Sequence, residues 1–310
     1  MAAAEGVVLA AVDIGTNTLK FTVARCFPDG RVETIDERND AVRIGAGIEQ
    51  TGRIDPERLD RAVTTLKGFE AIGREHDARR FVGVATEALR VASNGRDLLD
   101  RIAKETAWEI RIIPGEEEAR LTFLGLRDYL HDGGRATIVD IGGGSLEVIA
   151  ATAGKVETAF SIPIGSGRVA DRWFHADPPG ADALRQAEDD ARDFLRERAP
   201  ILDGRGGTLL LSGGNGQFIE GLREHYRIAE RLGIDTIARL LAILANEPAD
   251  AVAAALAIQY ERAVVLPAGV AIALAVAKAM EPVRVEAVPS GIRTGLLRDL
   301  IAREGMPGSP

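Results

Sequence analysis

The stretch Ile138-Val-Asp-Ile-Gly-Gly-Gly-Ser-Leu-Glu-Val-Ile149 decides the fold of this 310-residue chain. A short apolar run ends at Asp140, three glycines and Ser145 follow, and a second apolar run carries Glu147. This order predicts a strand, a tight turn and a return strand. The glycines let the backbone approach a ligand, and their N–H groups can form a concave anion site. An ordinary glycine hairpin fits the same residues.

Two acids flank this turn, one at the end of the first strand and one on the return strand. Carboxylates in such positions can hold a hard cation beside a bound anion. Phosphate together with Mg²⁺ is the simplest ligand pair that needs both the glycines and the acids. The stretch therefore predicts a phosphate and metal turn.

Nearly the same residues occur earlier in the chain, where Ala11-Val-Asp-Ile-Gly15 matches Ile138-Val-Asp-Ile-Gly142. Both copies end an apolar run and precede another strand. The recurrence predicts two similar domains, each with a phosphate turn, although so short a string can also recur by chance. Elsewhere, candidate strands alternate with helical patterns, which is typical of the α/β fold class.

Composition limits the classes of function. The chain has 38 basic and 47 acidic residues and a formal charge of −9, which argues against general binding of nucleic acid. A single cysteine, Cys26, excludes an intrachain disulfide and fits a reducing cytoplasm. We find no targeting segment, and the uncharged run 263–277 is shorter than the ~20 residues that span a bilayer. No membrane association is expected, and the second half of this run is predicted to be a buried helix.

Further motifs point to a family. The two Asp-Ile-Gly turns, Thr86-Glu-Ala-Leu-Arg90, Gly115-Glu-Glu-Glu-Ala-Arg-Leu121 and the stretch 140–147 resemble the exopolyphosphatase/guanosine pentaphosphate phosphohydrolase family. The resemblance extends from Val8 to about Leu300. It implies membership of the actin-like, sugar-kinase and heat-shock ATPase superfamily. The chain ends where short family members end, so we expect it to lack the additional C-terminal domains of the long members.

The resemblance also implies an architecture and a set of ligand contacts. It predicts two ribonuclease-H-like domains, 1–130 and 131–310, with a cleft between them. Mg²⁺ is expected on Asp140 and Glu147, with Asp13 as a further candidate ligand. The expected phosphate contacts are Gly15, Thr16, Asn17, Thr18, Gly142, Gly143, Gly144, Ser145, Gly213 and Gly214. The last two belong to a third predicted glycine turn, 212–216.

Phosphoryl transfer to water also needs a base and neutralisation of the phosphoryl charge. Arg90 matches the family's cleft arginine and could bind phosphate in bidentate fashion. Glu118 matches the family's catalytic glutamate, and Glu117 is the alternative. The residues alone leave another explanation open, because acids in a predicted first helical turn are favoured by the helix dipole. The family resemblance favours the catalytic interpretation.

The chain departs from the family pattern at Glu87, Asn215 and Thr294. Glu87 occupies a position where relatives usually have a small or amide residue beside the cleft arginine. A carboxylate there weakens anion binding unless it turns outward or holds metal. These departures affect the substrate contacts more than the fold.

The resulting hypothesis is an exopolyphosphatase that removes the terminal phosphate of inorganic polyphosphate. Removal of the 5′-terminal phosphate of guanosine pentaphosphate is the alternative substrate reaction, because the same groups would act on either molecule. A non-catalytic sensor of polyphosphate or alarmone, and a kinase of the same superfamily, are the alternatives from other classes. The apolar C-terminal helices leave a homodimer open.

Overall fold

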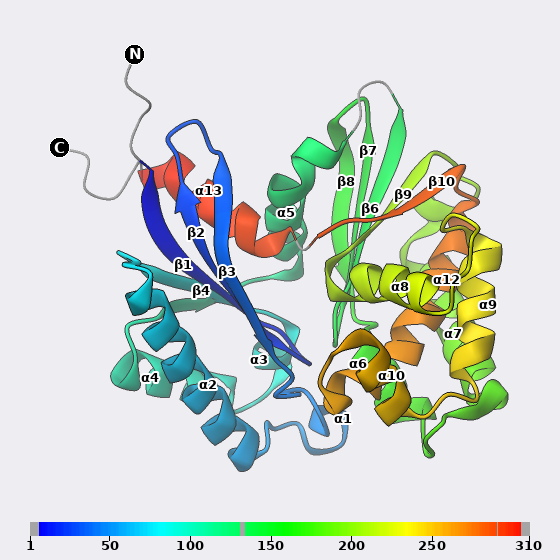
Figure 1. Cartoon of the computed structure of the whole chain (residues 1–310), viewed down its shortest axis with the longest axis horizontal. Helices are drawn as coiled ribbons and strands as arrows, with labels where there is room; N and C mark the ends of the chain where they lie inside the picture. Colours follow the sequence, from blue (N-terminus) through cyan, green and yellow to red (C-terminus); the bar gives the residue numbers. More distant parts are fainter. Residues whose placement is uncertain (1–5, 131–133, 290, 305–310) are drawn as a thin grey trace. The chain divides into compact units, whose positions relative to one another are not determined.

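The structure, a computed structural model, describes residues 6–130, 134–289 and 291–304 (Figure 1). The chain divides into a first unit, Met1–Leu126 with Gly291–Pro310, and a second unit, Arg127–Ser290. The sequence-based division at residue 130 assigns the last twenty residues to the second domain. The structure instead groups the final helix with the first unit.

The first unit contains a five-stranded sheet in the order β3-β2-β1-β4-β5. The pairs β1–β2 and β2–β3 are antiparallel, whereas β4 is parallel to β1 and β5 is parallel to β4. This is the strand order of the predicted ribonuclease-H-like fold. The strands are β1 (Val7–Ile14), β2 (Leu19–Cys26), β3 (Val32–Asp40), β4 (Phe81–Ala85) and β5 (Glu109–Ile112).

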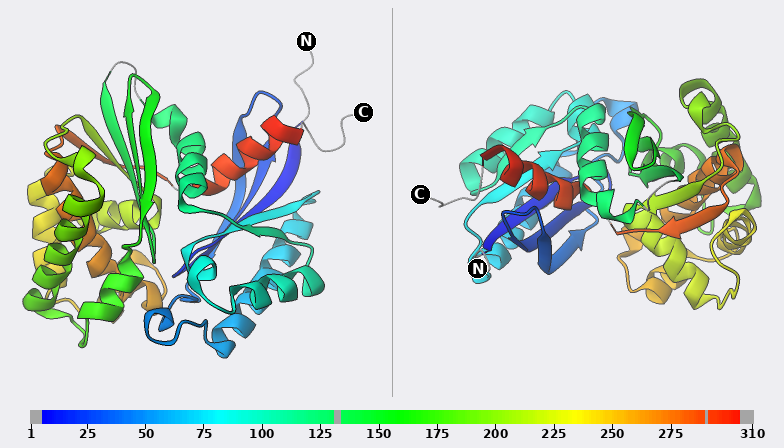
Figure 2. Two further views of the ribbon diagram at one scale, coloured as in Figure 1. Left: turned by 180° about the vertical axis from the view of Figure 1, so that it is seen from behind. Right: turned by 90° about the horizontal axis from the view of Figure 1, so that it is seen from above.

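Helices cover both faces of this sheet (Figures 1 and 2). One face packs against α2 (Pro56–Glu75) and α4 (Gly95–Glu105), and the other packs against α5 (Gly115–Leu126) and α13 (Ile292–Glu304). Residues 10, 12 and 14 of β1 belong to the first face, and residues 7, 9 and 11 belong to the second. This alternation directs Asp13 toward the face covered by α5 and α13. The short helices are α1 (Ile48–Thr51) and α3 (Glu87–Val91).

Glycines let α13 approach α5 very closely. A Cβ atom on Gly125 would lie 1.7 Å from the carbonyl oxygen of Gly291, and one on Gly295 would lie 1.8 Å from that of Leu121. The side chain of Arg298 also donates to the carbonyl of Leu124 at 2.8 Å. This backbone contact explains why the C-terminal helix belongs to the first unit.

The second unit repeats the topology of the first. Its five-stranded sheet has the order β10-β9-β6-β7-β8, with antiparallel β6–β7 and β7–β8 pairs and parallel β6–β9 and β9–β10 pairs. The α/β class and the duplication predicted from the Asp-Ile-Gly repeat are therefore confirmed. The strands are β6 (Arg135–Ile141), β7 (Leu146–Thr152), β8 (Lys155–Ile162), β9 (Thr208–Ser212) and β10 (Arg284–Ala287).

The helices of the second unit surround a large apolar core. They are α6 (Ser166–Trp173), α7 (Gly180–Arg198), α8 (Gly213–His225), α9 (Ile234–Leu244), α10 (Ala249–Leu256), α11 (Tyr260–Ala263) and α12 (Leu266–Met280), with 3₁₀ turns η1 (Arg127–Tyr129) and η2 (Pro200–Leu202). The segment Tyr260–Met280 is long and apolar enough to cross a membrane, but 83% of its most apolar window is buried inside the protein. The predicted buried helix is confirmed as α12.

Two local predictions differ from the structure. The helical pattern of residues 249–260 predicts one helix, but Ala257 adopts a left-handed conformation with φ 51° that ends α10. The third glycine segment is the first turn of α8 rather than a free turn. Gly213 has φ 72°, a conformation that glycine adopts without strain, so the chain passes directly from β9 into the helix.

Candidate functional site

The hairpin of the second unit places two carboxylates side by side. Asp140 on β6 and Glu147 on β7 are directly opposite in the antiparallel register, so their side chains lie on the same face. Both side chains are buried, with 8% and 2% of their surfaces exposed. The turn between them closes through a 2.9 Å hydrogen bond from Gly142 N to the carbonyl oxygen of Ser145.

Hydroxyl groups extend this row of acids across the sheet. Ser161 lies opposite Glu147 on β8, and its Oγ donates to Glu147 Oε1 at 2.7 Å. Ser212 lies opposite Asp140 on β9, and its Oγ is 3.4 Å from Asp140 Oδ2. The same face of the second sheet therefore carries two carboxylates flanked by two donors.

The glycine turn at residues 142–145 is held in place by hydrogen bonds from the start of α6. The carbonyl oxygen of Gly142 accepts from Ser166 N at 2.9 Å, and that of Gly143 accepts from Gly167 N at 2.8 Å. A Cβ atom on Gly165 would lie 2.5 Å from the carbonyl carbon of Gly143. Contacts to α6 thus fix the conformation of the predicted phosphate turn.

The first turn of α8 lies beside Asp140. A Cβ atom on Gly213 would lie only 2.6 Å from Asp140 Oδ1, and one on Gly214 would lie 2.7 Å from a terminal nitrogen of Arg262. Asn215 is buried and donates its side-chain amide to the carbonyl of Ile141, at the end of β6. The structure therefore brings Gly213 next to Asp140 and Gly214 next to Arg262.

Arg262 is a residue that the sequence reasoning missed. It lies on α11, is 8% exposed, and its guanidinium carbon is 5.1 Å from the centre of the Phe218 ring. Burial lowers the pKa of Arg262 to about 10, while the negative charge of Asp140 acts in the opposite direction. It remains positively charged at neutral pH. A signal existed in the sequence, since an arginine directly precedes the uncharged run 263–277.

The hairpin of the first unit has the same register but other side chains. Asp13 on β1 lies opposite Lys20 on β2, and the Lys20 Nζ is 4.0 Å from Asp13 Oδ2. Gly15 N donates to the carbonyl oxygen of Thr18 at 3.2 Å, the equivalent of the bond that closes the second turn. The Lys20 ammonium therefore already compensates the charge of Asp13, which makes Asp13 a weaker candidate for a metal ligand.

The tip of the first turn is supported by the loop at residues 41–47. The carbonyl oxygen of Thr16 accepts from Gly45 N at 2.9 Å, and that of Asn17 accepts from Arg43 N at 2.8 Å. The side chains of Asn17 and Thr18 are buried. The four predicted phosphate residues of this turn thus form one ordered loop at the end of β1.

Arg90 and Glu118 come together in the first unit. The Arg90 Nη1 is 3.6 Å from Glu118 Oε2 and donates to the carbonyl oxygen of Ile113 at 2.7 Å. Glu118 is 8% exposed and lies on α5, which covers the sheet face toward which Asp13 is directed. Glu87, at the start of α3, is 5% exposed, so it does not turn outward to solvent.

Glu117 is held differently from its neighbour. It pairs with Arg111 at 2.8 Å and with Arg120 at 3.5 Å. The hydrogen bond from Arg111 lowers the pKa of Glu117 below its ordinary value. A carboxylate with a lowered pKa accepts a proton less readily, which weakens Glu117 as the candidate base.

The residues present fit a magnesium ion. No group of three or more His, Cys, Asp or Glu side chains suited to a metal occurs among the residues that the structure describes. Mg²⁺ does not require such a cage, because it commonly binds one or two carboxylates together with water and substrate phosphate. Asp140 and Glu147, side by side at a glycine turn, meet that requirement.

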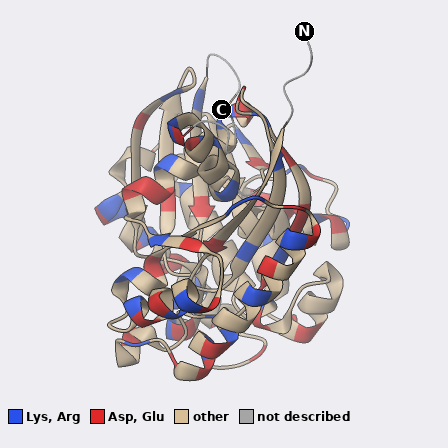
Figure 3. Cartoon of the chain, turned by 90° about the vertical axis from the view of Figure 1, so that its left-hand side faces the viewer, with Lys and Arg blue, Asp and Glu red and all other residues tan. Residues whose placement is uncertain are grey.

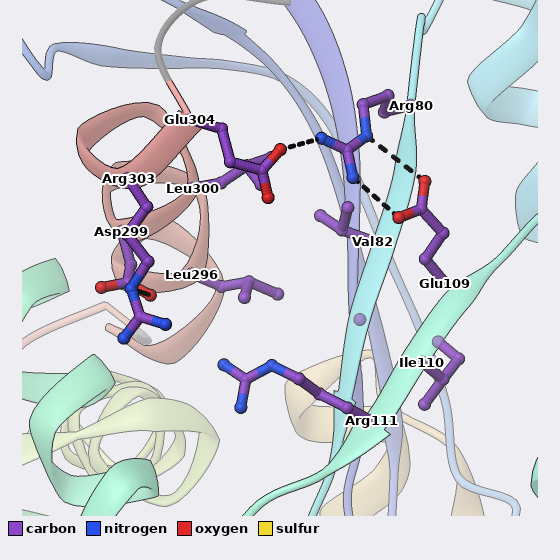
Figure 4. A pocket seen from close by; sticks show the side chains of 11 residues that line it. Arg80, Val82, Glu109, Ile110, Arg111, Leu296, Asp299, Leu300, Arg303 and Glu304 are labelled. Carbon is purple, nitrogen blue, oxygen red and sulfur yellow. Dashed lines mark hydrogen bonds and ion pairs between the residues drawn. The ribbon is translucent and has the colours of Figure 1, made fainter.

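A separate cavity of about 250 Å³ lies in the first unit (Figure 4). It is bounded by β4, β5 and α13 and contains none of the predicted site residues. Arg80 bridges Glu109 at 2.7 Å and Glu304 at 2.5 Å across its rim, while Arg303 pairs with Asp299 at 3.0 Å. Because these arginines already have carboxylate partners, we interpret the ion pairs as structural and do not assign a ligand to the cavity.

Comparisons with known proteins identify the family of the chain. The Ppx/GppA phosphatase family model matches residues 23–304. Exopolyphosphatase 1 of Mycobacterium leprae is 28% identical over 306 residues, covering 93% of this chain and 88% of that protein. Exopolyphosphatase 1 of Mycobacterium tuberculosis is 34% identical over 182 residues, covering 58% of this chain. That match spans about half of the relative, 53% of its length.

Solved structures give the same result. An exopolyphosphatase from Cytophaga hutchinsonii is 26% identical with a TM-score of 0.83, covering 95% of this chain and 98% of that one. The Ppx/GppA family member of Aquifex aeolicus is 25% identical with a TM-score of 0.74, covering 96% and 99%. Together with the family match over most of the sequence, these similarities establish that the chain belongs to the Ppx/GppA phosphatase family.

Proposed function

We propose that this chain is an exopolyphosphatase, a phosphoanhydride hydrolase that releases the terminal phosphate of inorganic polyphosphate. The observation that carries the proposal is the pair of opposed, buried carboxylates, Asp140 and Glu147, at a glycine turn. Phosphoryl transfer needs a cradle for the phosphate and charge neutralisation on its oxygens. The second hairpin has the residue types for both tasks. The mycobacterial relatives are exopolyphosphatases by name, which favours polyphosphate as the substrate.

Asp140 and Glu147 would hold Mg²⁺, which supplies Lewis-acid neutralisation of the phosphoryl oxygens when bound. The backbone N–H groups of Gly143 to Ser145 would bind the oxygens of the phosphate under attack, while the Gly142 N–H closes the turn. This role is supported by the hydrogen bonds that tie the turn's carbonyls to α6, because they fix its conformation before substrate arrives. A preorganised turn does not have to be ordered at the moment of binding.

Glu118 would accept a proton from the attacking water, and Arg90 would bind a phosphate oxygen. The Arg90 Nη1 lies 3.6 Å from Glu118 Oε2, so the proposed base and the proposed phosphate-binding group are neighbours. Arg90 would contact both Glu118 and a phosphate oxygen through different N–H groups of its guanidinium. One of these groups already donates to the carbonyl oxygen of Ile113.

Local groups matter because the chain as a whole repels anions. Its formal charge is −9, and basic and acidic residues are interspersed on the side shown in Figure 3. Binding of an anionic substrate therefore depends on individual cations and backbone N–H groups rather than on net charge.

The cytoplasmic location and the homodimer stay predictions.

Guanosine pentaphosphate is the second candidate substrate. A Cβ atom on Gly214 would lie 3.4 Å from the ring of Phe218, and the same ring is stacked near the Arg262 guanidinium. Aromatic rings and guanidinium planes are the groups on which nucleobases stack. This arrangement at the start of α8 is the observation that supports a nucleotide as the second candidate substrate.

Phosphate release tests the proposal. Long-chain polyphosphate, guanosine pentaphosphate and ATP are compared with Mg²⁺ present, using wild type, Glu118→Gln and Glu116→Gln. Glu118→Gln should lower kcat by ~10²–10⁴-fold, the usual effect of losing a general base. Glu116 lies in the same helical turn but is exposed, so Glu116→Gln is a matched control and should keep kcat within about twofold of wild type.

The outcomes separate the parts of the proposal. Absence of phosphate release from all three substrates would contradict the enzymatic function and favour a sensor. A Glu118→Gln variant with wild-type kcat would reject the base assignment but not the reaction. Release from guanosine pentaphosphate alone would move the substrate assignment to the second candidate.

A further inference from the structure

Ser161 is the residue of β8 that lies directly opposite Glu147. Its Oγ donates a 2.7 Å hydrogen bond to Glu147 Oε1. Glu147 is 2% exposed and Ser161 is half-buried, so the bond forms largely away from bulk water. A hydrogen bond in such surroundings restricts the rotation of a carboxylate more strongly than one at an exposed site.

A β-bulge brings Ser161 to this position. Thr152 pairs with Lys155 and Ala151 with Val156, but the register shifts between Ala150 and Ala151. Without the shift, the same register would bring Phe160 opposite Glu147. Neighbouring residues of a strand point to opposite faces, so Ser161 would then point away from Glu147. The bulge thus gives Glu147 a hydroxyl partner instead of an aromatic ring.

We propose that Ser161 is a positioning residue that orients the Glu147 carboxylate for binding a divalent cation. The inference rests on the proposed function, in which Asp140 and Glu147 bind Mg²⁺. Hydrogen-bond partners of metal ligands fix the orientation of the ligand, and their loss typically weakens metal binding by ~10–100-fold. Ser161 lies outside the glycine-turn motif and acts on the metal only through Glu147.

Calorimetric titration with Mg²⁺ alone, on the full chain without substrate, tests this role. Two variants of nearly equal shape differ only in the hydroxyl: Ser161→Thr keeps the donor and Ser161→Val removes it. We expect Ser161→Val to bind Mg²⁺ about tenfold more weakly than Ser161→Thr. Ser161→Ala should show a similar loss without added bulk. Thr158→Ala removes another half-buried hydroxyl of β8 and should leave the affinity unchanged.

Melting temperatures in the absence of Mg²⁺ establish that each variant is folded. Equal Mg²⁺ affinities of Ser161→Thr and Ser161→Val would overturn the positioning role and leave the metal site intact. Equal losses from Thr158→Ala would overturn it too, because the effect would then belong to the strand as a whole. If wild type does not bind Mg²⁺, both this inference and the proposed metal site are overturned. The same holds if Glu147→Gln binds Mg²⁺ as tightly as wild type does.

Discussion

In the first unit the hairpin at the end of β1 runs Asp13-Ile-Gly-Thr-Asn-Thr-Leu-Lys20, and in the second unit its counterpart runs Asp140-Ile-Gly-Gly-Gly-Ser-Leu-Glu147. The two share their register, their turn hydrogen bond and even the position of the β-bulge in the following pair of strands. Their opposed side chains differ in charge. The first pairs a carboxylate with an ammonium, whereas the second pairs two carboxylates.

This difference assigns distinct tasks to two copies of one backbone. A carboxylate and an ammonium side by side neutralise each other within the protein. Two carboxylates side by side repel each other, so a cation that binds them stabilises the folded state. Arg262 supplies one positive charge near Asp140, and the proposed Mg²⁺ would supply the remainder. The first hairpin is thus suited to hold its shape without a metal, and the second to bind one.

The largest expected effect comes from giving the second hairpin the charge pattern of the first. Glu147→Lys places an ammonium opposite Asp140, as Lys20 lies opposite Asp13. We expect phosphate release to fall by on the order of 10³-fold, because metal-ion catalysis supplies several kcal/mol. The melting temperature should stop rising with added Mg²⁺, because the cation no longer prefers the folded state.

Glu147→Gln is the control for this exchange, since it removes the charge without adding an ammonium. It should also lose activity, but without gaining an ion pair to Asp140. Phosphate release by Glu147→Lys at the wild-type rate would contradict the idea that the charge difference separates the two hairpins.

The opposite experiment removes the cation from the first hairpin. Lys20→Met keeps the aliphatic stem but leaves Asp13, whose side chain is 9% exposed, without its ammonium. We expect the free energy of unfolding to fall by about 1–2 kcal/mol, because removing one partner leaves a buried charge less compensated. Urea denaturation in a Trp173→Phe background measures this, since the remaining tryptophan, Trp108, is buried in the first unit.

A second substitution supplies the control. Asp13→Asn combined with Lys20→Met removes both charges and should recover part of the lost stability. If Lys20→Met alone unfolds at the same urea concentration as its parent, the pair contributes nothing and the first hairpin does not depend on its internal cation. Mg²⁺ should not restore stability to this variant.

The sequence predicted what local pattern can encode. The Asp-Ile-Gly repeat indicated the duplication, and the apolar runs that end at Asp13 and Asp140 placed these acids at strand ends. Arg262 was missed because its approach to Asp140 depends on how α11 packs, not on neighbouring residues. Ser161 was missed because the bulge shifts the register of β8. A regular register extended from the turn at Gly154 pairs Glu147 with Phe160 instead. The position of α13 depends on glycine contacts with α5, and these two helices are far apart in the sequence.

The smallest expected effect concerns how the first unit pairs its other acids. Arg111→Met removes the main partner of Glu117, and a partly exposed pair of this kind contributes about 0.5 kcal/mol. The folded-state pKa of Glu117 is lowered, so its stabilisation is present above the ordinary value of 4.5 and disappears as pH falls through the lowered pKa. Urea denaturation should therefore separate wild type from Arg111→Met at pH 7 and bring them together in acid.

The same variant tests which glutamate is the base. Releasing Glu117 from Arg111 raises its pKa, which would increase phosphate release at neutral pH if Glu117 were the base. If Glu118 is the base, kcat should change by less than about threefold, because Glu118 keeps its own contact with Arg90. Arg120→Met is the comparison variant: Arg120 contacts Glu117 at 3.5 Å and also pairs with Asp299 at 2.8 Å, so its loss should raise the pKa of Glu117 less than the loss of Arg111 does. A large rise in kcat for Arg111→Met alone would transfer the catalytic role to Glu117.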